Sequence, residues 1–158
     1  MRFFLTLATL LIFNISATAK DILTIEIEGQ ASGVVEILLL PDVAPKHVER
    51  IKTLAESGAY DNIVFHRVIE GFMAQTGDVQ FGIKGSPDIV NAGRGGSKLP
   101  NLPAEFSTLE YTKGVVGMAR SSQPDSANSQ FFIMFNDAPF LNGKYTISIQ
   151  FADIPIVF

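Results

Sequence analysis

The sequence predicts a mainly β domain, folded as a single antiparallel barrel or sandwich, and three observations support this prediction. Short apolar runs of strand length recur along the chain, separated by turns that are rich in Gly, Pro, Ser and Asn. Only one segment has a clear helical periodicity. No internal repeat or interior linker divides the chain, and its 158 residues, 47% of them hydrophobic, suffice for one core.

The N-terminal segment, residues 1–19, is predicted to be a secretory signal peptide. Arg2 provides a positive start, residues 3–13 are almost entirely apolar, and Ala17-Thr18-Ala19 forms a small-x-small cleavage site. The apolar run is shorter than the about 20 residues that a membrane span needs. We therefore expect residues 20–158 to form an exported, periplasmic domain with no membrane attachment after cleavage.

Two strands and a helix are expected next. Residues 22–28 alternate apolar and polar side chains, as a half-buried strand does, and residues 34–40 form the return strand. A helix is expected from Pro45, with Gly58 as its C-terminal stop. The apolar face of this helix comprises Val48, Ile51, Leu54 and Ala55.

The stretch FHRVIEGFMAQTGD, residues 65–78, predicts two short strands that fold back on each other. Gly71 breaks the first strand, so that a second strand at 72–76 can return beside it. This arrangement brings Arg67 close to the apolar pair Phe72-Met73 and to the amide of Gln75. The structural interpretation of Arg67 is a surface residue of a hairpin, and the motif alone favours it.

The rest of the chain predicts a long loop and three more strands. Residues 79–103 are rich in Gly, Pro, Ser and Asn, and strands are expected at 115–119, 130–135 and 145–151. The glycine-rich run at 93–98 lacks the spacing of a phosphate-binding P-loop, so we interpret it as a turn.

Composition excludes several kinds of chemistry. The chain has no Cys, which excludes disulfides, thiolate catalysis and Cys-ligated metals, and its net charge of -4 gives no basic field for nucleic acid. We expect His47 to be a solvated helix residue and His66 to have a hydrogen-bonded structural role. No metal or cofactor is expected, because no ligand cluster with suitable spacing exists. What remains possible is a reaction that needs only hydrogen bonds and an apolar pocket.

Three motifs resemble the cyclophilin family of peptidyl-prolyl cis-trans isomerases, most closely its exported bacterial branch. They are FHRVIEGFMAQTGD at 65–78, GMARSSQPDSANSQFFI at 117–133 and FLNGKYT at 140–146. The resemblance implies a closed antiparallel β-barrel with capping helices. It also implies isomerisation of X-Pro bonds in exported proteins to assist their folding. The expected partners are proline-containing polypeptides; we expect no cofactor, no nucleic acid and a monomeric protein.

The resemblance also implies a set of site residues. The catalytic residue is Arg67. The proline pocket is implied to consist of Phe72, Met73, Phe132 and Leu141, and the contacts to the substrate backbone come from Gln75, Ala119 and Gln130. The substrate-binding set is completed by Arg120, Phe140 and Tyr145. The family often has Asn at the first of these positions, and its eukaryotic members carry Trp and His at the other two. Trp at the position of Phe140 contributes a ring N–H to ciclosporin binding in the family.

The last residues depart from the family pattern. After Thr146 the chain reads ISIQFADIPIVF, where the family continues through a strand, a helix and a final strand. We therefore expect the C-terminal helix and the last strand to be missing, and the domain to be incomplete at this end. Two alternatives to an active isomerase remain open: a non-catalytic module that binds proline peptides, and a poorly folded, truncated product.

Overall fold

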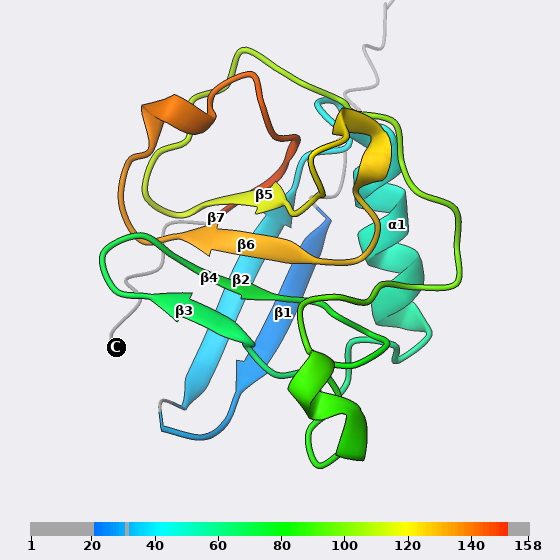
Figure 1. Ribbon diagram of the computed structural model, residues 1–158. Helices are drawn as coiled ribbons and strands as arrows, with labels where there is room; N and C mark the ends of the chain where they lie inside the picture. Colours follow the sequence, from blue (N-terminus) through cyan, green and yellow to red (C-terminus); the bar gives the residue numbers. More distant parts are fainter. Residues whose placement is uncertain (1–20, 31, 152–158) are drawn as a thin grey trace, which may run out of the picture.

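The computed structural model describes residues 21–30 and 32–151 (Figure 1). The expected signal peptide lies outside these residues, and so does the tail after residue 151, on which the expected loss of a helix and a strand falls. Among the described residues, no helix combines the length and the apolar character that crossing a bilayer requires.

Within the described residues, seven strands form one sheet in the order β1-β2-β7-β5-β6-β4-β3, and every pairing is antiparallel. In Figure 1, β1 and β2 cross behind β3, β4 and β6, so the sheet curls over on itself. The prediction of a mainly β, antiparallel fold is confirmed. The strands are β1 Ile22–Ile27, β2 Gly33–Leu39, β3 Arg67–Ile69, β4 Met73–Thr76, β5 Val115–Met118, β6 Phe131–Met134 and β7 Ile147–Phe151.

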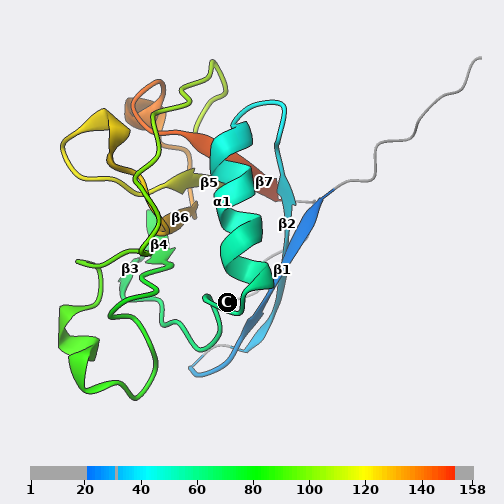
Figure 2. The ribbon, with the colours of Figure 1, turned by 90° about the vertical axis from the view of Figure 1, so that its right-hand side faces the viewer.

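The described part of the chain has one α-helix, α1 (Pro45–Glu56), which lies against the sheet, as Figure 2 shows. Pro45 suits the first helical position because its missing N–H has no partner to lose there. Gly58 follows the helix with a φ of +70°, and its N–H bonds the carbonyl of Ala55, which confirms it as the C-terminal stop. The loops between residues 57 and 146 also contain three short 3₁₀ helices: η1 Pro87–Asn91, η2 Pro124–Ser126 and η3 Pro139–Leu141.

Alternate residues of the central strands belong to two different apolar clusters. In β6, Phe131 and Ile133 pack into a cluster with α1 and β2, whereas Phe132 and Met134 pack into a second cluster. Successive side chains of a strand point to opposite faces, so the two-residue period of β6 separates the clusters. The second cluster contains the apolar residues that the sequence assigns to the pocket.

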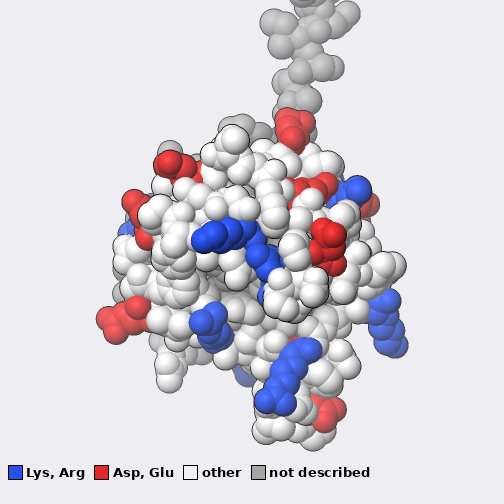
Figure 3. All heavy atoms as spheres, turned by 45° about the horizontal axis from the view of Figure 1, so that its top comes forward, with Lys and Arg blue, Asp and Glu red and all other residues white. Residues whose placement is uncertain are grey.

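Charged side chains are sparse on the surface. In the view of Figure 3, Lys and Arg side chains are interspersed with Asp and Glu side chains, and most of this face is uncharged. This agrees with the low charged fraction of the sequence, 18%.

Candidate active site

The β3–β4 hairpin places Arg67 directly opposite Gln75, and Ile69 opposite Met73. Gly71 forms the turn between the strands with a φ of +68°, a left-handed conformation that Gly adopts without steric cost. The predicted proximity of Arg67 and Gln75 is therefore confirmed, and Met73 and Phe72 lie further along the same hairpin, towards its turn. Arg67 is exposed, and its Nη1 lies 3.5 Å from Oε1 of Gln75, at the long limit of a hydrogen bond.

A relay of side-chain amides continues from this contact into the protein. Gln75 Nε2 donates to Oε1 of Gln130 at 2.8 Å, and Gln130 Nε2 donates to the carbonyl of Gly95 at 2.8 Å. The carbonyl of Gly95 can only accept, so it fixes the orientation of Gln130 and hence that of Gln75. On the next strand, the N–H of Ala119 donates to the backbone carbonyl of Gln130. Arg67 is therefore the outermost hydrogen-bond donor in this series of side chains.

An apolar cluster lies beside this relay. Met73 is only 2% exposed, Phe132 and Leu141 are also buried, and Phe132 stands opposite Gln75 in the β4–β6 pairing. Phe72 is half-buried and stacks on Phe140 with 5.9 Å between the ring centroids. Phe140 itself is 59% exposed, so this stacked pair keeps apolar surface accessible next to the buried residues of the cluster.

The other side of the cluster is closed by Tyr145. Its ring meets Phe132 edge to face at 5.7 Å, and the guanidinium of Arg120 lies 4.5 Å from its centroid. Ala119 packs against the same cluster. The residues assigned to the site from the sequence thus form one contiguous neighbourhood, with Arg67 and Arg120 at its edges.

Sequence reasoning missed the role of Asp78 in holding the loop beside this site. Its buried carboxylate accepts N–H bonds from Gly93 at 2.7 Å and Gly95 at 2.9 Å, and further ones from Gln80 and Phe81. Burial alone would raise the pKa of Asp78, but these four bonds lower it overall. The glycine-rich run is a turn tied to Asp78, and the Gly95 carbonyl that ends the amide relay belongs to it.

His66 lies beside this loop without the hydrogen bonds that we expected. Both ring nitrogens are buried, and neither has a partner that meets hydrogen-bond geometry in the described part of the chain. Burial lowers the pKa of His66, although the nearby Asp78 carboxylate and the Gln130 amide act in the opposite direction. The ring packs against the backbone of Gly93, where a Cβ would come within 3.0 Å of it.

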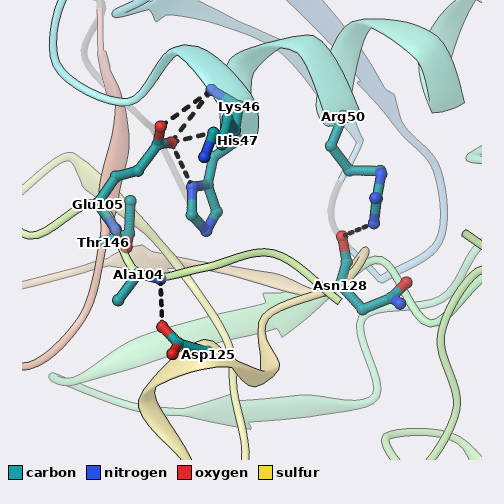
Figure 4. A network of polar contacts seen from close by, with 8 residues as sticks. All are labelled: Lys46, His47, Arg50, Ala104, Glu105, Asp125, Asn128 and Thr146. Atoms are coloured by element: carbon teal, nitrogen blue, oxygen red, sulfur yellow. Dashed lines mark hydrogen bonds and ion pairs between the residues drawn. The ribbon is translucent and has the colours of Figure 1, made fainter. Parts of the chain in front are cut away.

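A second polar cluster lies at the N-terminus of α1 (Figure 4). His47 is fully buried, so its expected solvation was wrong, and its Nδ1 lies 2.6 Å from Oε2 of Glu105. Glu105 also accepts the backbone N–H groups of Lys46 and His47, and therefore caps a helix that lacks a side-chain cap of its own. The N–H of Glu105 donates in turn to Oγ1 of Thr146.

The directions of the pKa shifts of His47 and Glu105 follow from their burial and from their hydrogen bonds. Burial is the main cause that lowers the pKa of His47, because it removes water from the charged imidazolium, and this outweighs the opposing effect of Glu105. Burial would raise the pKa of Glu105, but the hydrogen bonds from His47 and the helix N–H groups lower it overall. The pair is consistent with a neutral His47 that donates its Nδ1 proton to the Glu105 carboxylate.

Neither cluster is a metal centre by its composition. Within residues 21–30 and 32–151, no three His, Asp or Glu side chains are grouped so that they could hold a metal ion. The site near Arg67 instead offers one guanidinium, two amides and an apolar surface.

This site on an antiparallel β fold offers hydrogen-bond donors and an apolar surface, and the described residues that form it include no evident covalent nucleophile. The family model for "Cyclophilin type peptidyl-prolyl cis-trans isomerase/CLD" matches residues 22–148. A "Probable peptidyl-prolyl cis-trans isomerase" of Brucella suis is 56% identical over 133 residues, covering 84% of this chain and 68% of its own length. A "Peptidyl-prolyl cis-trans isomerase-like 1" of Emericella nidulans is 41% identical over 108 residues, covering 66% of this chain and 60% of its own.

Solved structures agree with the sequence relatives. A cyclophilin-type isomerase of Cryptosporidium parvum, crystallised in the presence of the dipeptide Ala-Pro, has a TM-score of 0.67 and 31% identity. That alignment covers 77% of this chain and 74% of the other. A cyclophilin of Hirschia baltica has a TM-score of 0.63 and 26% identity, with 75% and 60% covered. The chain belongs to the cyclophilin family of peptidyl-prolyl cis-trans isomerases, and both the expected family and the expected isomerase function are confirmed.

Proposed function

We propose that this chain isomerises X-Pro bonds in exported proteins and that Arg67 is its catalytic residue. The observation that carries the proposal is the placement of Arg67. Its guanidinium is exposed and lies at the end of an amide relay beside the buried Met73 and Phe132; among the described residues, its one hydrogen bond is the long contact with Gln75. Its donors are therefore free to reach a bound peptide.

The reaction requires no bond to be made or broken. Rotation about an X-Pro bond faces a barrier of about 18–20 kcal/mol, because amide resonance must be lost. A turnover on the order of 10³ s⁻¹ requires that barrier to fall by roughly 5–7 kcal/mol. A donor directed at the prolyl nitrogen draws its lone pair out of conjugation, and this interaction is strongest in the twisted state.

Arg67 suits this role because a guanidinium is always charged and holds its donors in a fixed plane. The apolar cluster grips the proline ring, with Met73, Phe132 and Leu141 as its floor and Phe72 and Phe140 as its rim. Gln75, Gln130 and the backbone at Ala119 hold the peptide while one side of the bond turns. The Ala-Pro dipeptide named with the Cryptosporidium parvum structure supports a proline-containing ligand for this site.

A protease-coupled assay with an Ala-Pro-containing peptide tests the proposed activity. We expect the wild-type chain to accelerate the cis-to-trans step, and a peptide without proline to show no effect. Peptide binding with no acceleration would instead identify a non-catalytic binding module. Absence of both binding and acceleration would reject the proposed site.

The exported setting needs a separate test, because it depends on residues 1–19. The full chain, expressed in a Gram-negative bacterium, should appear in the periplasmic fraction with Lys20 as its first residue by mass spectrometry. A variant with Ala17→Leu and Ala19→Leu removes the small side chains of the cleavage site and should remain uncleaved. Recovery of uncleaved wild-type chain in the cytoplasm would contradict export.

A further inference from the structure

We propose that Arg120 is a positioning residue, which clasps two loops together and thereby holds Tyr145 against Phe132 in the proline pocket. The proposal rests on the proposed function of that pocket and assigns Arg120 a role through Tyr145. The two loops follow β5 and precede β7, and they lie at the same end of the molecule in Figure 1.

The hydrogen bonds of Arg120 are directed at its own chain. Nε and Nη2 donate to the carbonyl of Lys144 at 3.0 and 2.6 Å, as the two prongs of a fork. Nη1 donates to the carbonyl of Ser121 at 2.8 Å and approaches that of Ser122 at 3.4 Å. The guanidinium thus joins the carbonyl of one loop to the carbonyls of the other.

The clasp stands where backbone pairing stops. The ladder between β5 and β7 ends with the N–H of Met118 bonded to the carbonyl of Thr146. The next N–H, that of Ala119, donates to the carbonyl of Gln130 on the other side of β5, as the alternation of a strand flanked by two neighbours requires. The side chain of Arg120 reaches the carbonyl of Lys144, two residues before Thr146, and so adds a side-chain link next to the end of this ladder.

The same guanidinium lies over an aromatic ring of the pocket. Its carbon is 4.5 Å from the centroid of Tyr145, and the Tyr145 ring meets Phe132 edge to face at 5.7 Å. The cation–π attraction acts together with the two hydrogen bonds from Arg120 to Lys144, because both interactions hold the segment that contains Lys144 and Tyr145. Tyr145 therefore packs between Phe132 and Arg120, so that Arg120 can hold the Tyr145 ring in contact with Phe132.

This role makes a different prediction from a direct contact between Arg120 and the substrate. A substrate contact that needs only positive charge would survive Arg120→Lys. The clasp would not, because an ammonium cannot present two parallel donors to one carbonyl while stacking on a ring. In addition, loss of Arg120 and loss of the Tyr145 ring should disturb the same wall of the pocket.

The test is a double-mutant cycle of Arg120→Lys and Tyr145→Leu, measured as KM and kcat for an Ala-Pro peptide. Because the affected contacts are worth about 1 kcal/mol, each single variant should raise KM by about 5–10-fold. We expect kcat to stay within about twofold, since Arg67 is undisturbed. The double variant should be no worse than the weaker-binding single variant. Arg94→Lys, at an exposed arginine, is the matched control and should resemble wild type.

A readout that needs no turnover separates this proposal from the proposed function. In the unliganded protein, Arg120→Lys should shift the ring-proton NMR signals of Tyr145 and Phe132, whereas Arg94→Lys should not. An inactive wild type with these shifts would reject the isomerase site and keep the clasp. Unchanged ring signals, additive KM effects, or wild-type KM in Arg120→Lys would each overturn the clasp.

Discussion

The N-terminus of α1 and the site at Arg67 are both polar clusters, and they differ in how many of their hydrogen bonds are made within the protein. The Glu105 side chain is 14% exposed and is bonded by His47 and by two helix N–H groups. Arg67 is exposed, and among the described residues its side chain makes one contact, the 3.5 Å bond to Gln75. A group whose bonds are all internal stabilises the fold, whereas free donors beside an apolar cluster are available to a ligand.

The largest expected effect is a loss of activity on substitution of Arg67. Arg67→Ala should lower kcat/KM by about 100-fold or more, the cost of losing one donor that acts in the transition state. Its melting temperature should change by only about 2 °C, because exposed substitutions rarely affect stability. Arg67→Lys should also be poor, since an ammonium lacks the planar fork. Near-full turnover of Arg67→Ala would show that the residue has no catalytic role.

Substitutions in the His47–Glu105 cluster at the N-terminus of α1 should instead lower stability and leave activity nearly unchanged. Glu105→Ala leaves the helix N–H groups and the buried His47 without their acceptor, and should lower the free energy of unfolding by about 2 kcal/mol. Urea melts measure this loss, and kcat per folded molecule should stay within about twofold of wild type. Glu110→Ala, an exposed carboxylate of the same loop, is the control. Equal midpoints for the two variants would contradict the capping role.

Acid should lower the stability of the protein, because it favours protonation of His47 in the cluster with Glu105. Burial lowers the pKa of His47 below its ordinary value of 6.5, so the unfolded chain takes up this proton at a higher pH than the folded chain. Stability is then fully present above about pH 6.5 and decreases as the pH falls towards the folded pKa, by up to about 1.4 kcal/mol per pH unit. His47→Gln should flatten the slope of melting temperature between pH 7.5 and 5.5.

Part of this slope should remain in His47→Gln, because burial lowers the pKa of His66 as well. A variant as steep as wild type would show that His47 does not titrate in this range. A rise in stability on acidification would reverse the sign and contradict the neutral, buried state of His47.

The smallest expected effect is on ciclosporin inhibition, and it concerns Phe140 at the exposed edge of the site around Arg67. Phe140 is 59% exposed and stacks on Phe72, so a larger ring can be accommodated towards solvent. Phe140→Trp adds apolar area and a ring N–H, and should strengthen ciclosporin inhibition several-fold from a weak wild-type level. Phe106→Trp, at an exposed Phe outside the assigned site, is the control. Equal inhibition of wild type and Phe140→Trp would show that this position does not govern binding.

The same contrast explains what could be predicted from sequence. Arg67 and Gln75 are eight residues apart on strands joined at Gly71, so the alternation of the motif and one turn residue determine that they meet. His47 was misjudged because its acceptor, Glu105, lies 58 residues away on a loop without regular structure. The partner of Arg120 is a backbone carbonyl 24 residues away, which no side-chain pattern reveals. Contacts within one hairpin follow from local rules, whereas contacts between loops depend on how those loops pack.

The proposed mechanism requires the apolar cluster to bind proline and Arg67 to lower the barrier to rotation about the X-Pro bond. NMR exchange spectroscopy of an Ala-Pro peptide tests both requirements in one sample, because it reports peptide binding and the cis–trans exchange rate together. With Arg67→Ala, titration should still shift the signals of Met73 and Phe132, while the exchange cross-peaks of the peptide disappear. Exchange at the wild-type rate in Arg67→Ala would contradict this mechanism.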